Sequence, residues 1–350
     1  GAVVALIGWM LTPMLLRTII RVSDEVVFEY AVLYMRIYCI GLPFQFLYNA
    51  CASALRGVGD SKASLIFLLV SSAVNVLLDL LLIVVFTMGV TGAAIATVIS
   101  QAVCAAVSYG YLRKKFPRAK GAKVFDAKLA LTVTKIGLPT SIQQGVVSFG
   151  NITLMRLVHH FAAIGTTGIV EAYTAGSRID MFAFVPIMGF QSALASFTGQ
   201  NIAAGRLDRV KRGYFLTLAY GVGTTLAICL LMYFLADPLV SLFSLRGDAL
   251  VYGAEQIRYY SKTIWVFALY MVLGGVLQGA GDTLFQSAAT LSSLAVRVAL
   301  SYIGVFAASW FGYEAAWSTL IYGWIIALLT TNIRFYTGGW MKKAIARRKT

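Results

Sequence analysis

About ten apolar runs, each long enough to cross a lipid bilayer as a helix, fill most of this chain. Turn-like or charged breaks separate them. The runs cover residues 1–20, 26–56, 63–88, 90–112, 132–158, 164–199, 213–244, 250–278, 284–309 and 313–337. Several exceed the length of one crossing, so we expect tilted or kinked helices. The chain is therefore predicted to be an all-α polytopic membrane protein.

Composition excludes an ordinary soluble domain. Hydrophobic residues make up 59% of the chain and charged residues 12%, and the mean hydropathy is +0.80. Soluble domains have shares nearer a half and a quarter. The net charge of +15 does not predict nucleic-acid binding, because the basic residues form clusters beside the apolar runs rather than a binding stripe. The four cysteines lie inside apolar runs, so we interpret them as packing residues without disulfides.

The distribution of Lys and Arg predicts the orientation in the membrane. Seven of these residues lie in 113–128, four in 206–212 and five in the tail "KKAIARRKT", whereas the alternate connections carry only Arg21 and Arg246. Basic connections face the cytoplasm by the positive-inside rule. With ten crossings, we expect both ends of the chain on the cytoplasmic side of the plasma (inner) membrane.

An internal repeat organises the chain. At an offset of 222 residues, "LRGVGD" (55–60) aligns with "LQGAGD" (277–282), and 19 of the 70 positions from 30 to 99 are identical to their partners. Shared hydrophobicity does not explain glycines, an aspartate and an arginine that match in register. Residues 131–222 have no counterpart upstream, so we expect about 90 further residues, with two helices, before the first half.

The repeat predicts two six-helix halves, the first lacking its first two helices here. Each half has an even number of crossings, so the two should be related by an axis along the membrane normal. The predicted parts are a first lobe (1–112), a basic cytoplasmic linker (113–130), a second lobe (131–337) and a basic cytoplasmic tail (338–350).

Several motifs together resemble the multidrug and toxic compound extrusion (MATE) family of secondary antiporters. These are "LRGVGDS" and its echo "LQGAGDT", "GLPTSIQQ" (137–144), "AYTAGSRIDMFAFVPIMG" (172–189) and "GQNIAAGRLDRV" (199–210). The resemblance implies a V-shaped pair of lobes with a substrate cavity between or within them. It also implies export of small organic cations or drugs in exchange for Na⁺ or H⁺ by alternating access. We expect a monomer without a cofactor.

A carboxylate inside an apolar run is the clearest candidate for cation coupling. Asp79 lies within 63–88, where a central charge costs roughly 2.5–3.5 kcal/mol on insertion scales. Asn75 projects from the same helical face, and Thr97 on the next helix is a third oxygen. Such oxygens can hold a small cation, or the carboxylate can take up a proton. The set resembles the site of MATE members that couple through the amino-terminal lobe. The alternative is that Asp79 only bonds across helices.

The second lobe lacks the acidic residue that some family members carry there. That position, eight residues after Pro139, is Val147, and the repeat partners of Asp79 and Asn75 are Ser301 and Arg297. We therefore expect coupling in the first lobe.

Substrate contacts are predicted from resemblance and polarity. The candidate cavity residues are Tyr34, Asn49, Gln143, Gln144, Asn151 and Arg297. Aromatic and methionine side chains suit a broad range of mostly apolar organic cations. Arg178 and Asp180 are interpreted as structural, paired with each other or with neighbours, and Glu255 with Arg258 as an interfacial pair.

Other functional classes fit less well. The chain has no G-x-x-x-x-G-K-[ST] phosphate loop, which disfavours an ATP-driven pump. A membrane enzyme would need a cluster of His, Cys or paired carboxylates at one depth, so we do not expect an enzyme. The alternative is a flippase for lipid-linked oligosaccharides, whose cavity should carry several Arg and Lys.

Overall fold

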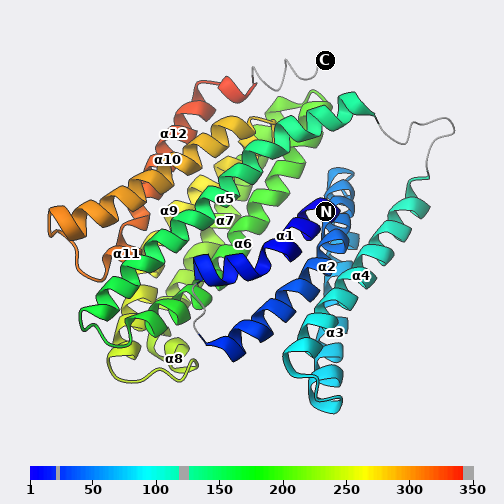
Figure 1. The fold of residues 1–350 in the computed structure, drawn as a ribbon. Coiled ribbons are helices and arrows are strands. Elements are labelled where there is room, and N and C mark those ends of the chain that lie inside the picture. The colour runs from blue at the N-terminus through cyan, green and yellow to red at the C-terminus, as the bar shows by residue number, and fades with distance from the viewer. Residues whose placement is uncertain (21–23, 118–125, 342–350) are drawn as a thin grey trace. The chain divides into compact units, whose positions relative to one another are not determined.

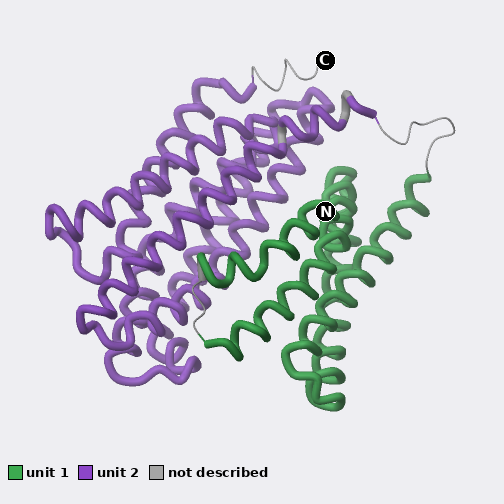
Figure 2. Tube along the Cα trace, in the orientation of Figure 1, with its two compact units in different colours: residues 1–124 green, residues 125–350 purple. Residues whose placement is uncertain are grey.

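The computed structural model describes residues 1–20, 24–117 and 126–341. The regular elements in this part are all helices. They form two compact units, Gly1–Val124 and Phe125–Thr350, which we describe separately (Figures 1 and 2). Much of the predicted basic linker and tail, and Arg21, lie outside the described residues.

Unit 1 is a small helical bundle. Its elements are α1 (Ala2–Leu15), the π-helical segment η1 (Leu16–Ile20), α2 (Glu25–Gly57), α3 (Ser61–Asp79), the π-helical segment η2 (Leu80–Val85) and α4 (Gly89–Lys115). The long helix α2 packs against α1 and α4, and α3 packs mainly against α4. Asp24 caps α2, since its Oδ1 accepts hydrogen bonds from the amides of Val26 and Val27.

Unit 2 is larger and has the more extensive core. Its elements are α5 (Ala127–Ala163), α6 (Ile169–Ala203), α7 (Leu207–Phe234), α8 (Ala236–Ser241), α9 (Asp248–Gly279), α10 (Thr283–Tyr302), the π-helical segment η3 (Ile303–Ala307), α11 (Ala315–Ser318) and α12 (Leu320–Tyr336). Helix α9 is central: it packs against α6, α7, α8 and α12, and most of its residues from Gly253 to Leu277 are buried.

The helices confirm a multi-pass membrane protein. Within the described residues, eight helical segments are long and apolar enough to cross a bilayer, and Ala2–Thr18 is a shorter apolar helix. Two predicted runs are divided. The run 213–244 breaks after Phe234, and the ring of Pro238 accounts for it because proline clashes with the carbonyl four residues earlier in a helix. The run 313–337 begins with the separate short helix α11.

The sequence repeat recurs in the order of elements. Helices α2 and α3 with η2 in unit 1 correspond to α9 and α10 with η3 in unit 2. The two loops of the repeated motif also share their conformation. Gly59 and Gly281 have φ of 87° and 73°, a left-handed conformation that glycine adopts without a steric cost. The amides of Asp60 and Asp282 each donate to a carbonyl five residues earlier, at 2.8 Å.

The aspartate of each motif joins its loop to the end of the lobe's last helix. Asp60 Oδ2 accepts hydrogen bonds from the Lys115 ammonium group (2.5 Å) and the Tyr111 hydroxyl (2.9 Å) on α4. Asp282 Oδ2 accepts one from Arg334 Nε (2.8 Å) on α12. The repeated motif is therefore a structural joint at equivalent positions of the two units.

Close packing of α6 on α9 depends on two glycines one turn apart. A Cβ atom at Gly275 would lie 2.7 Å from the Gln191 carbonyl oxygen, and one at Gly279 would lie 2.3 Å from that of Ala195. Small residues at this spacing let helix backbones approach closely in membranes. This contact fixes α6 beside α9, and both helices contribute to the site described next.

Candidate functional site

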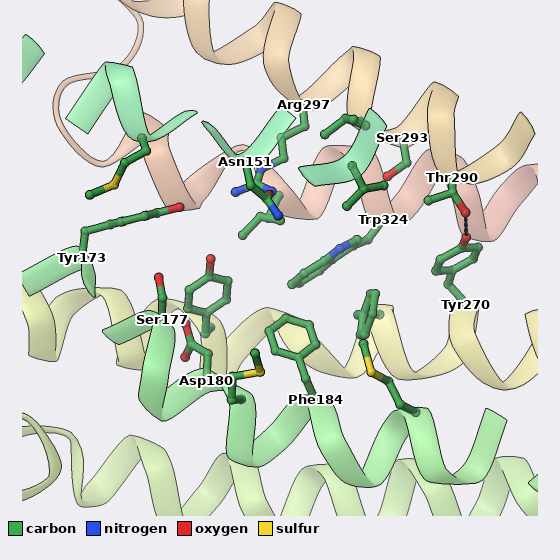
Figure 3. A pocket seen from close by; sticks show the side chains of 18 of the residues that line it. Asn151, Tyr173, Ser177, Asp180, Phe184, Tyr270, Thr290, Ser293, Arg297 and Trp324 are labelled. Atoms are coloured by element: carbon green, nitrogen blue, oxygen red, sulfur yellow. Dashed lines mark hydrogen bonds between the residues drawn. The ribbon is translucent and has the colours of Figure 1, made fainter. Parts of the chain in front are cut away.

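Unit 2 contains a cavity of about 610 Å³ among α5, α6, α9, α10 and α12 (Figure 3). This volume lies within the usual range for small-molecule sites. Six aromatic side chains line it: Tyr173, Phe184, Tyr260, Phe267, Tyr270 and Trp324. Three methionines add flexible apolar surface: Met155, Met181 and Met188. The wall is thus mostly apolar, with a few polar groups at defined places.

The aromatic rings of the wall contact one another. Phe184 on α6 and Phe267 on α9 meet edge to face, with ring centroids 4.9 Å apart, and Phe267 lies 5.2 Å from Trp324 on α12. Tyr270 and Thr290 share a hydrogen bond of 2.5 Å between their hydroxyl groups (Figure 3). Rings held by three helices form a surface suited to flat, apolar ligands.

Asp180 is the acidic residue of the wall. Its side chain is 2% exposed, and Oδ2 accepts a hydrogen bond of 3.3 Å from Gln256 Nε2, a fully buried amide on α9. Oδ1 has no hydrogen-bond partner among the described residues. A Cβ atom at Gly176 would lie 2.6–2.8 Å from the Gln256 side-chain amide, so this glycine makes room for the amide beside Asp180.

Arg297 on α10 is the basic residue of the wall and is 9% exposed. Its guanidinium group donates to Asn151 Oδ1 (3.5 Å) on α5 and to the Ala316 carbonyl (3.3 Å). Nε has no partner within the described ranges. Figure 3 shows Asp180 and Arg297 entering from different helices on opposite sides of the cavity.

Two predicted substrate residues, Asn151 and Arg297, line this cavity, as does Val147. Gln143 and Gln144 lie nearer the start of α5 than Val147 and are not among the residues that line the cavity. Tyr34 and Asn49 belong to unit 1, where Tyr34 stacks on Tyr38 with centroids 6.3 Å apart and Asn49 is exposed. The roles of these four residues stay predictions.

Sequence reasoning missed Asp180 as a cavity residue. Arg178 is exposed, and Asp180 bonds to Gln256, so the two do not pair with each other. A helical stripe could have revealed the site, since Tyr173, Ser177 and Asp180 follow at spacings of four and three residues. Phe184 continues the stripe.

The proposed interfacial pair was also wrong. Arg258 forms its ion pair with Asp237, not Glu255. Glu255 Oε2 instead accepts a hydrogen bond of 3.0 Å from the Tyr313 hydroxyl. Spacing along α9 puts Glu255 and Arg258 within reach of each other, but each binds a residue from another part of the chain instead.

In unit 1, Asn75 and Asp79 each have a buried polar atom without a hydrogen-bond partner among the described residues. Both residues are half-buried near the end of α3. Asp79 Oδ1 and Asn75 Nδ2 are buried and have no hydrogen-bond partner in the described part of the chain. A π-helical segment, η2, begins directly after Asp79. Such segments are frequent at functional sites.

The register between α3 and α4 places Asn75 opposite the turn of Thr97. The Cys104 thiol donates to the Phe67 carbonyl (3.4 Å), and one turn on, the Ser71 hydroxyl donates to the Ser100 carbonyl (3.0 Å). Continuing this antiparallel register puts the turn of Asn75 opposite the turn that contains Thr97, and the turn of Asp79 opposite the preceding turn of α4. The Thr97 hydroxyl donates to the Ala93 carbonyl (2.9 Å), which leaves its oxygen able to accept or coordinate.

A multi-pass helical protein built on a repeat, with a ligand-sized cavity within one unit, has the architecture of a secondary transporter. A family model described as MatE matches residues 1–81 and 139–303, well over half of the chain. The chain belongs to this MATE family of transporters.

Individual relatives agree with this assignment. The probable multidrug resistance protein YoeA of Bacillus subtilis (strain 168) is 30% identical over 376 residues, which cover 99% of this chain and 76% of that protein. The FAD transporter of Shewanella oneidensis is 29% identical over 241 residues, which cover 65% of this chain and 50% of that protein.

A solved structure shows the same fold. It is a transporter of the MOP superfamily from Pyrococcus furiosus Vc1, a protein for which the reverse polarity of the binding pocket suggests a different function. Its TM-score is 0.86 at 21% identity, and the match covers 100% of this chain and 76% of that one.

Proposed function

We propose that this protein exports aromatic organic cations or drugs across the plasma membrane, with the cavity of unit 2 as a binding site. The observation that carries the proposal is the cavity itself: about 610 Å³, six aromatic rings, three methionines and the Asp180 carboxyl group. Aromatic faces attract cations, and methionine adapts to ligands of different shape. The probable multidrug resistance protein YoeA, a relative over nearly the whole chain, supports the export of drugs.

We further propose that Asp79, Asn75 and Thr97 couple export to entry of Na⁺ or H⁺. Asp79 Oδ1 and Asn75 Nδ2 are buried without partners in the described ranges, as expected of groups that bind a mobile ion. The Asn75 amide can rotate to present its oxygen, because oxygen and nitrogen of an amide are exchanged by a half turn. A cation would then meet a carboxylate, an amide oxygen and a hydroxyl.

Efflux of a fluorescent organic cation from vesicles tests both proposals. Native protein and Asp79→Asn would be compared under separate Na⁺ and H⁺ gradients. We expect native efflux to respond to one gradient, which identifies the ion, and the variant to lose that response. Gradient-driven efflux by the variant at the native rate would contradict coupling at Asp79. Absence of efflux by the native protein would contradict the proposed substrate class.

The second candidate function is transport of an anionic amphiphile. A flippase for lipid-linked oligosaccharides would perform such transport. Arg297 in the cavity wall and the Shewanella oneidensis FAD transporter favour it. The wall contains one basic residue and one acidic residue, which is less positive charge than a pyrophosphate group requires. Uptake of a labelled pyrophosphate-linked lipid into the opposite leaflet, abolished by Arg297→Gln, would favour this candidate instead.

A further inference from the structure

Asp180 and Arg297 line one cavity without forming an ion pair with each other. None of the ion pairs among the described residues joins them, although both side chains are at least nine-tenths buried. They enter from α6 and α10, on opposite sides of the space (Figure 3). Burying an ionisable side chain without an oppositely charged partner is unfavourable, so such residues are usually kept for a function.

The hydrogen bonds that hold the two groups are long. Asp180 has one at 3.3 Å, and the two of Arg297 measure 3.3 and 3.5 Å, at or beyond the usual range for an N–H to oxygen bond. Each group also keeps an atom with no partner among the described residues, Oδ1 in Asp180 and Nε in Arg297. Both can therefore exchange weak bonds for stronger ones to a ligand.

A ligand with a single charge satisfies only one of these groups. An organic cation beside Asp180 adds a positive charge to a cavity whose wall already contains Arg297, and an anion beside Arg297 faces the carboxyl group of Asp180. Repulsion between like charges is stronger between buried groups than in bulk water, because the local dielectric constant is lower. A molecule with both charges avoids either penalty, and the aromatic rings of the cavity wall would hold its flat body.

We propose that the preferred ligand of this cavity is an amphoteric aromatic molecule, with its cationic group at Asp180 and its anionic group at Arg297. The proposal rests on the proposed function and makes its substrate class narrower. It also accounts for the presence of Arg297, which a site for simple organic cations does not need.

A series of xanthene dyes tests the proposal with one scaffold in different charge states. Rhodamine 110 carries a cation and a carboxylate, its methyl ester rhodamine 123 carries only the cation, and fluorescein carries no cation. Fluorescence polarisation with the purified protein gives Kd for each. We expect rhodamine 110 to bind about tenfold more tightly than either of the others, as one additional charge-assisted contact provides.

Variants of the two charged residues assign the contacts. In Arg297→Gln, the preference for rhodamine 110 over rhodamine 123 should disappear, whereas Arg297→Lys should keep most of it. In Asp180→Asn, the preference for rhodamine 110 over fluorescein should disappear. Arg178→Gln, an exposed site on α6, is the matched control and should change neither ratio. Each preference is a ratio of two Kd values, and it is compared between variant and native protein. This comparison cancels the different partition of the dyes into detergent, as in a double-mutant cycle.

A native preference for rhodamine 110 below about threefold overturns the proposal, whether or not the variants fold. So does a preference that survives in Arg297→Gln. The experiment distinguishes this proposal from the proposed function. If vesicles export rhodamine 123 but the native protein binds rhodamine 110 no better, export of organic cations is supported and the preference for an amphoteric ligand is not. If rhodamine 110 is bound with the expected selectivity but neither dye is exported, the site stands and the proposed export does not.

Discussion

The hydroxyl groups of Ser301 and Thr319 lie 2.7 Å apart and share a hydrogen bond in the core of unit 2, where both residues are fully buried. The 222-residue repeat makes these positions equivalent to Asp79 and Thr97 of unit 1. Two neutral hydroxyls satisfy each other at this place in one unit. In the other, a carboxyl group and a hydroxyl occupy the equivalent turns, which is the asymmetry expected if unit 1 binds the coupling ion.

This difference predicts that the same substitution will affect stability at one threonine and the ion response at the other. Thr319→Val should lower thermal stability by about 1–3 kcal/mol, because it leaves the buried Ser301 hydroxyl with poorer partners, and should leave the ion dependence of transport unchanged. Thr97→Val should weaken the response to the coupling ion with a smaller loss of stability. Melting curves and gradient-driven efflux measure the two effects. Equal effects on ion dependence would contradict the assignment of coupling to unit 1.

Gly279 and its repeat partner Gly57 should respond differently to alanine. A Cβ atom at Gly279 would lie 2.6 Å from Thr198 Cβ and closer still to the Ala195 carbonyl, whereas one at Gly57 meets no atom within 4 Å. We expect Gly279→Ala to destabilise the protein by about 1–3 kcal/mol through overpacking of α6 on α9. Gly57→Ala should change the melting temperature little. A larger loss of stability for Gly57→Ala than for Gly279→Ala would contradict this difference in packing.

Asp60 should contribute a pH-dependent part of stability. Hydrogen bonds from Lys115 and Tyr111 lower the pKa of Asp60 below its ordinary value. A carboxyl group with a lowered folded-state pKa stabilises the fold above its unfolded pKa, near 4, and this contribution is lost as the pH falls through the folded-state pKa. The difference in melting temperature between native protein and Asp60→Asn should therefore shrink on acidification. Lys115→Met should give the same trend, and a difference that grows at low pH would contradict it.

The aromatic wall predicts the effect of removing one large ring. Trp324→Ala removes a side chain that contacts Phe267 and lines the cavity, so we expect binding of an aromatic cation to weaken by about tenfold or more. Trp310→Ala is the matched control, because Trp310 is 67% exposed and lies outside the cavity. Ligand affinity can be followed by fluorescence polarisation. Equal affinities for the two variants would exclude this cavity as the binding site.

Much of the fold could be predicted from the sequence, because the bilayer requires long apolar helices and the repeat has an unmistakable register. The positions of Gly59, Asp60, Gly281 and Asp282 already indicated equivalent loops. The break after Phe234 was not predicted, although Pro238 signals it at the right distance. Asp79 was chosen as a carboxylate inside an apolar run, and Asn75 by its helical spacing from Asp79 and by family resemblance; both have a buried side-chain atom without a partner among the described residues, and their role in coupling stays a prediction.

What the sequence determined by itself was local or periodic: helix length, the repeat, and the residues that share a helical face. The tertiary structure decided which of those faces meet. It placed Gln256 beside Asp180 and put Arg297 in the wall of the same cavity, and it paired Arg258 with Asp237 rather than Glu255. Helix spacing cannot specify such contacts, because each depends on how separate helices cross, and that is set by close packing at residues such as Gly275 and Gly279.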